Sequence, residues 1–242
     1  MQTPMDQKST LSEIRERFDK DVERFANLIT GQQATMDAPL VMDLITQAAK
    51  TATPHAKKIL DIGCGAGNNT LKLLQTINPL DCDMIDLSRP MLDRAKQRIS
   101  AVNGGKVRVF QEDIRTVDLP KGNYDIILAA MVLHHLRDDK DWEDTFSKLY
   151  RLTAPGGSIW IADFVNQENS FIQSIMWGRY GKYLESMGGA GYREKVFAYI
   201  DKEDTPRPVT YQLDLLRSAG FSEVDILHKN SCFVAFGAIK KG

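Results

Sequence analysis

The chain has 242 residues, 43% of them hydrophobic, which is enough for one α/β domain with a sizeable core. A formal net charge of −1 gives no overall indication of nucleic-acid binding, so nucleic acid is not an expected partner. The polar start of the chain and the lack of an apolar run near 18 residues predict neither a secretory leader nor a membrane span, so we expect a cytoplasmic protein.

Two helices are predicted before the first strand. Thr10 or Ser12 can cap a helix whose apolar residues recur at helical spacing through Leu28, and Gly31 ends it. A second helix is predicted before Pro54. These helices either pack on the sheet as ordinary amphipathic elements or help to close a site.

Residues 58–67 predict a buried strand that runs into a glycine-rich turn. Gly63, Gly65 and Gly67 permit a tight turn and let a ligand approach the bare backbone. The spacing differs from G-x-G-x-x-G and from the phosphate loop of nucleoside triphosphatases. Asp61 stands two residues before the turn, although a glycine turn also occurs in other α/β domains.

The second strand, residues 83–86, ends in an acid that lies 23 residues after Gly63. A carboxylate about 20 residues past a glycine turn is placed to accept hydrogen bonds from ribose hydroxyls. Asp86 is therefore a candidate ligand residue, and the alternative is an acid that stabilises the start of the next helix. Ser88 can cap that helix.

The third and fourth strands are predicted at residues 107–110 and 125–128. Asp113 follows the third strand, where it is either a ligand residue or an ordinary turn residue. Ala130 and His135 follow the fourth strand, and the small alanine permits close approach of a ligand.

The remaining elements complete an α/β sheet. A fifth strand is predicted at residues 158–164, followed by an aromatic and methionine-rich helical insertion at 165–208, a last helix at 210–218, and two closing strands. Successive strand–helix units imply right-handed crossovers and a doubly wound Rossmann-like sheet with ligands at the carboxyl ends of its strands. We expect seven strands, mostly parallel with an antiparallel last strand, in a single domain of residues 1–242 that comprises cap helices (1–54), core (55–164), lid or structural cap (165–208) and closing segment (209–242).

The pattern Asp-x-Gly-x-Gly-x-Gly at 61–67 resembles motif I of the class I S-adenosylmethionine-dependent methyltransferases. The segments at 86–92 and 129–136 are similar to further motifs of that family, so the resemblance covers nearly the whole chain. It implies S-adenosyl-L-methionine as cofactor and methyl transfer to a small-molecule substrate. The cofactor-binding residues that it implies are Asp61, Gly63, Cys64, Gly65, Asp86, Leu87, Met91, Asp113, Ile114 and Ala130.

His135 is the candidate catalytic residue, because a base assists when the acceptor must lose a proton. Its alternative role is to pack against or line the site. No spaced Cys/His ligand motif occurs, so no metal is expected. Weaker candidates for substrate contact lie beyond the fifth strand, and pairing of two chains into a homodimer through residues 165–208 stays open. These candidates are Tyr180, Tyr183, Arg193 and Tyr211.

A second resemblance leads to an alternative activity. The stretches 18–29, 112–115 and 219–221 are similar to carboxy-S-adenosylmethionine synthase, which makes a modified cofactor for tRNA wobble-uridine modification. Two departures weigh against that activity: Ala130 replaces an asparagine after the fourth strand, and Met36 or Asp37 falls where an aromatic contact is expected. A protein that binds the cofactor without catalysis is a further alternative.

Overall fold

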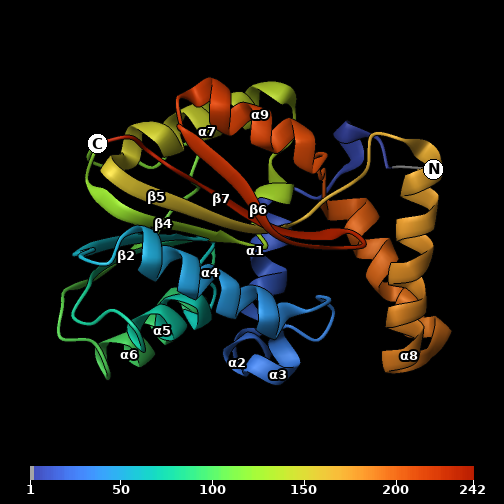
Figure 1. Ribbon diagram of the computed structural model, residues 1–242. Helices are drawn as coiled ribbons and strands as arrows, with labels where there is room; N and C mark the ends of the chain where they lie inside the picture. The colour runs from blue at the N-terminus through green and yellow to red at the C-terminus, as the bar shows by residue number, and fades with distance from the viewer. Residues whose placement is uncertain (1–2) are drawn as a thin grey trace.

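The computed structural model describes residues 3–242, which form a seven-stranded sheet in the order β3-β2-β1-β4-β5-β7-β6 (Figure 1). Neighbours from β3 to β5 are parallel, and β7 runs antiparallel to both β5 and β6. The doubly wound fold with its antiparallel last strand is therefore confirmed. The strands are β1 (Lys58–Ile62), β2 (Asp81–Asp86), β3 (Val107–Gln111), β4 (Tyr124–Ala130), β5 (Thr153–Phe164), β6 (Glu223–Asn230) and β7 (Phe233–Ile239).

Helices cover both faces of this sheet, because the central strands are apolar on both sides. Along β1, Ile59 faces one core cluster whereas Leu60 and Ile62 face the other, as the alternation of a strand requires. The first cluster is covered by α4 (Ala38–Ala52), α5 (Asn68–Leu74) and α6 (Arg89–Ser100). The second is covered by α7 (Asp139–Leu152) and α9 (Val209–Ala219).

The N-terminal segment departs from the single helix that its periodicity predicts. It forms three short helices, α1 (Leu11–Asp19), α2 (Val22–Ala26) and α3 (Leu28–Gly31), after the 3-10 turn η1 (Met5–Gln7). Thr10 caps α1 through a capping box with Glu13, as expected for one of the two candidates. The Asn27 side chain starts α3 by accepting from two backbone amides, so a new cap interrupts the apolar period.

The insertion is mainly the long helix α8 (Ser170–Glu203), drawn in orange at the edge of the molecule (Figure 1). The helix is interrupted at Gly188 and Gly189, and Gly189 has a φ of 77°. The aromatic side chains of its first half form a third core cluster with β5 and β7, and Tyr180 is 2% exposed there. The aromatic stripe therefore packs as a structural cap. Across residues 3–242, no helix combines the length and apolar character that crossing a membrane demands.

Candidate functional site

A cavity of about 930 Å³ lies at the carboxyl ends of the parallel strands. Its floor is formed by the turns that follow β1, β2, β3 and β4, and its roof by the N-terminal helices and the end of α8. Every predicted site residue except Asp61 lines it. These residues are Gly63, Cys64, Gly65, Asp86, Leu87, Met91, Asp113, Ile114, Ala130 and His135.

The glycine turn after β1 requires glycine at its first position. Gly63 has a φ of 62°, and a Cβ added to it would lie 2.5 Å from Cγ2 of Val132. The turn is tied to β2, because the Cys64 amide donates to the Ile85 carbonyl at 3.0 Å. The backbone therefore borders the cavity without a side chain, as expected for a turn that accommodates a ligand.

Asp86 connects the turn to the end of β2. One carboxylate oxygen accepts from the Gly65 amide at 2.8 Å, and the other accepts from the Ser88 amide at 2.9 Å. Burial raises the pKa of Asp86, and the two amide hydrogen bonds offset part of that rise. Since a carboxylate offers about four lone pairs, both oxygens can still accept from ligand hydroxyls. Asp86 thus stabilises the turn and can also accept hydrogen bonds from a ligand.

Asp61 lies beneath the turn, outside the cavity wall, and is 1% exposed. Thr70 donates to its Oδ2 at 2.6 Å, whereas Oδ1 is buried without a partner among the described residues. Burial raises the pKa of Asp61 to about 7, and the charge of Asp86 adds to the rise. Contact of the Asp61 carboxylate with a ligand stays a prediction, and the glycine turn separates this carboxylate from the cavity.

We expect Asp61→Asn to remove a pH-dependent loss of stability. The pKa of Asp61 is about 7 in the folded protein and 3.8 as an ordinary value. Between these pH values the carboxyl is ionised in the unfolded chain but still protonated in the folded one, so rising pH favours unfolding. Wild type should lose stability across that window, by up to about 4 kcal/mol if the whole shift is expressed. Urea unfolding at pH 5 and pH 8 would measure the effect.

The exposed Asp118 provides a matched control for this experiment. Asp118→Asn should keep the wild-type difference between pH 5 and pH 8, whereas Asp61→Asn should reduce it. Equal pH dependence in all three proteins would contradict a raised pKa at Asp61.

Asp113 lines the cavity after β3 and is paired with a neighbour. Arg115 donates to it from Nη2 at 2.7 Å, from Nε at 3.0 Å and from its backbone amide at 2.8 Å. Burial opposes ionisation, but these hydrogen bonds outweigh it and lower the pKa of Asp113. The same arginine binds Asp141 of α7 at 2.6 Å. Asp113 is therefore a fixed anionic acceptor at the cavity wall.

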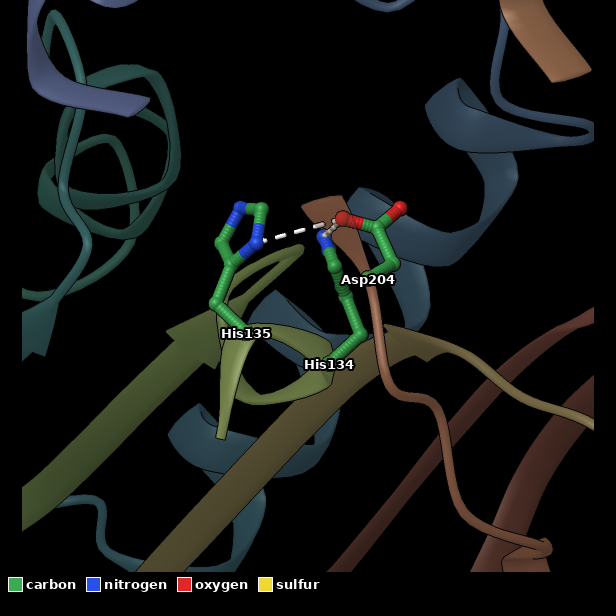
Figure 2. Close-up of side chains that lie close together, drawn as sticks. All are labelled: His134, His135 and Asp204. Atoms are coloured by element: carbon green, nitrogen blue, oxygen red, sulfur yellow. Dashed lines mark ion pairs between the residues drawn. The ribbon is translucent and has the colours of Figure 1, made fainter. Parts of the chain in front are cut away.

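Two histidines of the 3-10 turn η2 (Leu133–His135) meet an acid from a distant part of the chain (Figure 2). Nδ1 of His134 lies 2.5 Å from Oδ1 of Asp163, and Nε2 lies 3.8 Å from Oδ1 of Asp204. Burial lowers the pKa of His134, but attraction by the two carboxylates outweighs it and raises the pKa to about 9. His134 is thus a buried bridge between two acids.

His135 lies on the cavity side of this pair. Its Nδ1 is 3.2 Å from Oδ1 of Asp204, but it lacks hydrogen-bond geometry and has no hydrogen-bond partner among the described residues. Burial opposes ionisation of Asp204, yet attraction by His134 and the interaction with the adjacent His135 ring outweigh it and lower the pKa of that carboxyl. Sequence reasoning missed Asp204, because it follows α8 in a polar, proline-containing segment that carries no recognisable ligand spacing.

Asp204 is held in place by contacts between the start of the chain and the end of α8. Arg17 forms an ion pair with Glu203 at 2.6 Å, and the Ser9 amide donates to the Lys202 carbonyl at 3.0 Å. The amide of Thr205 donates to the carbonyl of His134 at 2.8 Å. Together these contacts, which we call the roof tether, fix the backbone on both sides of Asp204.

The four weaker candidates for substrate contact do not lie on the cavity wall. The hydroxyls of Tyr180 and Tyr183 donate to the backbone carbonyls of residues 34 and 33, and Arg193 pairs with Glu185 at 2.5 Å. Tyr211 packs against Trp142 on the far side of the sheet. The part of α8 that does line the cavity contributes Tyr192, Lys195, Val196 and Tyr199. The helical period did not indicate which face of α8 is turned inward.

The sequence of the core matches a family model described as "methyltransferase domain" over residues 59–157. Residues 59–157 are therefore a methyltransferase domain, and the chain is similar to class I S-adenosylmethionine-dependent methyltransferases. The matched segment contains the glycine turn, Asp86, Asp113 and the histidine pair, so it includes the cavity floor.

The relatives that this chain resembles differ in activity. An uncharacterized methyltransferase of Mycobacterium tuberculosis is 31% identical over 107 residues, which span 44% of this chain and half the length of that relative. A carboxy-S-adenosyl-L-methionine synthase of Shewanella piezotolerans is 26% identical over 231 residues, 93% of this chain and 92% of that protein.

A solved structure shows the same fold. The 1,6-didemethyltoxoflavin-N1-methyltransferase of Burkholderia thailandensis, solved with S-adenosylhomocysteine and 1,6-didemethyltoxoflavin, superposes with a TM-score of 0.64. The alignment covers 100% of this chain and 94% of that one at 16% identity. At this identity the likeness concerns the fold alone and leaves the acceptor open.

Proposed function

We propose that the protein binds S-adenosyl-L-methionine in the cavity and transfers its methyl group to a small-molecule nucleophile. The observation that carries this proposal is the meeting of a bare glycine turn with the carboxylates of Asp86 and Asp113 on one cavity wall. The volume of about 930 Å³ is near the upper end for small-molecule sites, so it can accommodate a cofactor together with an acceptor.

The residues on that wall fit an adenosyl cofactor. Asp86 would accept from the ribose hydroxyls, and Leu87 and Met91 offer an apolar surface for the adenine. Asp113 and the Ile114 amide would bind the polar edge of that ring. The methionine portion would lie along Gly63, Cys64, Gly65 and Ala130, where the residues of the wall are small.

The bound cofactor supplies a methyl group on a positively charged sulfur, which is already a good leaving group. The protein therefore has to hold the acceptor in line with that group and exclude water. Tyr192 and Tyr199 of α8 line the cavity on its roof side, so they would cover part of a bound acceptor. We propose that His135, which lies under this roof, assists loss of the acceptor's proton.

Calorimetry with S-adenosylmethionine and S-adenosylhomocysteine tests the cofactor site. We expect one molecule of each to bind per chain. A methyl-transfer screen over hydroxyl, amine and thiol metabolites, read by mass spectrometry, then tests the activity. Absence of cofactor binding to folded protein would contradict the proposal, whereas binding without any turnover would favour a non-catalytic cofactor-binding protein.

A carboxy-S-adenosylmethionine synthase activity is the second candidate, because the match to such an enzyme extends over almost the entire chain. The cavity disfavours it, because Ala130 provides no amide side chain. Arg193, which the resemblance suggests for binding the added carboxylate, is paired with Glu185 away from the wall. Incubation with prephenate and S-adenosylmethionine would decide between the two, since a carboxylated cofactor detected by mass spectrometry would establish the synthase activity.

A further inference from the structure

The cluster of His134, His135 and Asp204 has the composition of a metal site. One ligand atom from each residue lies within 4.8 Å of the others, and Oδ1 of Asp204 is 3.2 Å from His135 Nδ1 and 3.8 Å from His134 Nε2. Ligands bound to one ion at about 2.1 Å are separated by distances of this order. Figure 2 shows both rings directed at the same carboxylate oxygen.

Asp163 fixes the ring orientation of His134 through the nitrogen that faces away from Asp204. Asp163 contacts its Nδ1 at 2.5 Å, which leaves Nε2 as the atom that faces Asp204. Histidines that bind metals usually donate their other ring N–H to a carboxylate in this manner, since the partner fixes the tautomer and the ring plane. Asp163 is buried at the end of β5, so this support belongs to the rigid sheet.

The second histidine shows an unsatisfied donor or acceptor. Nδ1 of His135 is buried and has no hydrogen-bond partner among the described residues, although it lies close to Asp204. A buried polar atom without a partner is costly, so it calls for an explanation such as an ion. Two neighbouring cations already have partners, because Lys8 donates to the backbone carbonyls of Asp201 and Asp204 and Arg17 is paired with Glu203 through three hydrogen bonds.

We propose that His134, His135 and Asp204 bind a divalent first-row transition-metal ion whose remaining coordination positions open into the cavity. Two imidazoles with one carboxylate suit zinc or iron(II), and three protein ligands leave room for a substrate atom. All three residues line the cavity that also holds the proposed cofactor residues.

This inference rests on the proposed function and states how His135 would act. As a metal ligand, it helps to hold an ion that coordinates the acceptor's oxygen and lowers the pKa of that O–H group. The O–H proton would leave to water, and the oxygen would bond to the methyl carbon as the carbon–sulfur bond breaks and S-adenosylhomocysteine leaves. The acceptor class would therefore be a hydroxyl compound able to coordinate the ion.

The test uses the full chain, freed of metal by a chelator and then titrated with Co²⁺ followed by optical spectroscopy. We expect one ion per chain, visible absorption of a low-coordinate Co²⁺ site, and displacement by Zn²⁺. Asp204→Asn and His135→Ala should each weaken binding more than about 100-fold, because loss of an outer-shell partner alone costs about 10–100-fold. Asp163→Asn should produce that smaller loss.

His228 supplies the matched control. Nε2 of His228 lies 2.9 Å from Oδ2 of Asp37, which gives one histidine and one carboxylate instead of the proposed three ligands. His228→Ala should therefore leave Co²⁺ affinity unchanged. Circular dichroism and cofactor calorimetry on every variant confirm folding. No Co²⁺ binding to folded wild type, or unchanged affinity in both Asp204→Asn and His135→Ala, would overturn the metal site. Cofactor binding in the same samples reports on the proposed function separately.

Discussion

Replacing Asp86 with Ala should weaken S-adenosylmethionine binding by about 1–3 kcal/mol, which corresponds to roughly 5- to 150-fold. The substitution removes a charged acceptor for the ribose hydroxyls and also the bond that holds the Gly65 amide at 2.8 Å. Both losses act on the cofactor side of the cavity. Calorimetry of the folded variant measures the change in affinity.

Two comparisons separate the roles of Asp86. Asp86→Asn keeps an oxygen for the Gly65 amide but loses the negative charge, so its affinity should fall between wild type and Asp86→Ala. Asp93 on the exposed side of α6 pairs with Arg89 on the same helix, and Asp93→Ala should bind the cofactor normally. Unchanged affinity in Asp86→Ala would exclude Asp86 from the cofactor site.

Replacing His135 with Ala should lower kcat by about 10²–10⁴-fold with the acceptor found in the transfer screen, because assistance to proton loss is removed. Affinity for S-adenosylmethionine should stay unchanged, since the carboxylates proposed to bind the cofactor, Asp86 and Asp113, follow β2 and β3. Steady-state kinetics and calorimetry together measure these two quantities.

The exposed His55 serves as control, and His55→Ala should have wild-type kinetics. If His135→Ala loses cofactor binding and stability along with turnover, His135 would be a packing residue. If its turnover equals that of wild type, the proposed catalytic role would be wrong.

The cofactor side of the cavity could be predicted because its signals are local in sequence. Gly63, Gly65 and Asp86 each follow a buried strand, and parallel strands bring their carboxyl ends to one edge of the sheet. Even there, the sequence did not reveal that Arg115 engages both oxygens of Asp113. That pairing depends on a side-chain rotamer, which no residue spacing fixes.

The acceptor side could not be predicted in the same way. Asp204 lies beside the histidine pair because the second half of α8 runs along the cavity and ends there. No periodic pattern in the sequence predicts where that helix ends in space. The helical spacing also did not distinguish the tyrosines of α8. Tyr180 was a candidate for substrate contact but packs in the third core cluster. Tyr199 lines the cavity, although both tyrosines belong to the same helix.

The start of the chain contacts the end of α8 at one further point beside the roof tether, which matters for expression of the protein. Thr3 donates to Asp201 from its backbone amide at 3.1 Å and from its hydroxyl at 2.6 Å, only three residues before Asp204. A purification tag fused ahead of Thr3 would therefore crowd the segment that positions this acid. Figure 1 shows the C-terminus on the opposite side of the molecule, so an affinity handle belongs after Gly242.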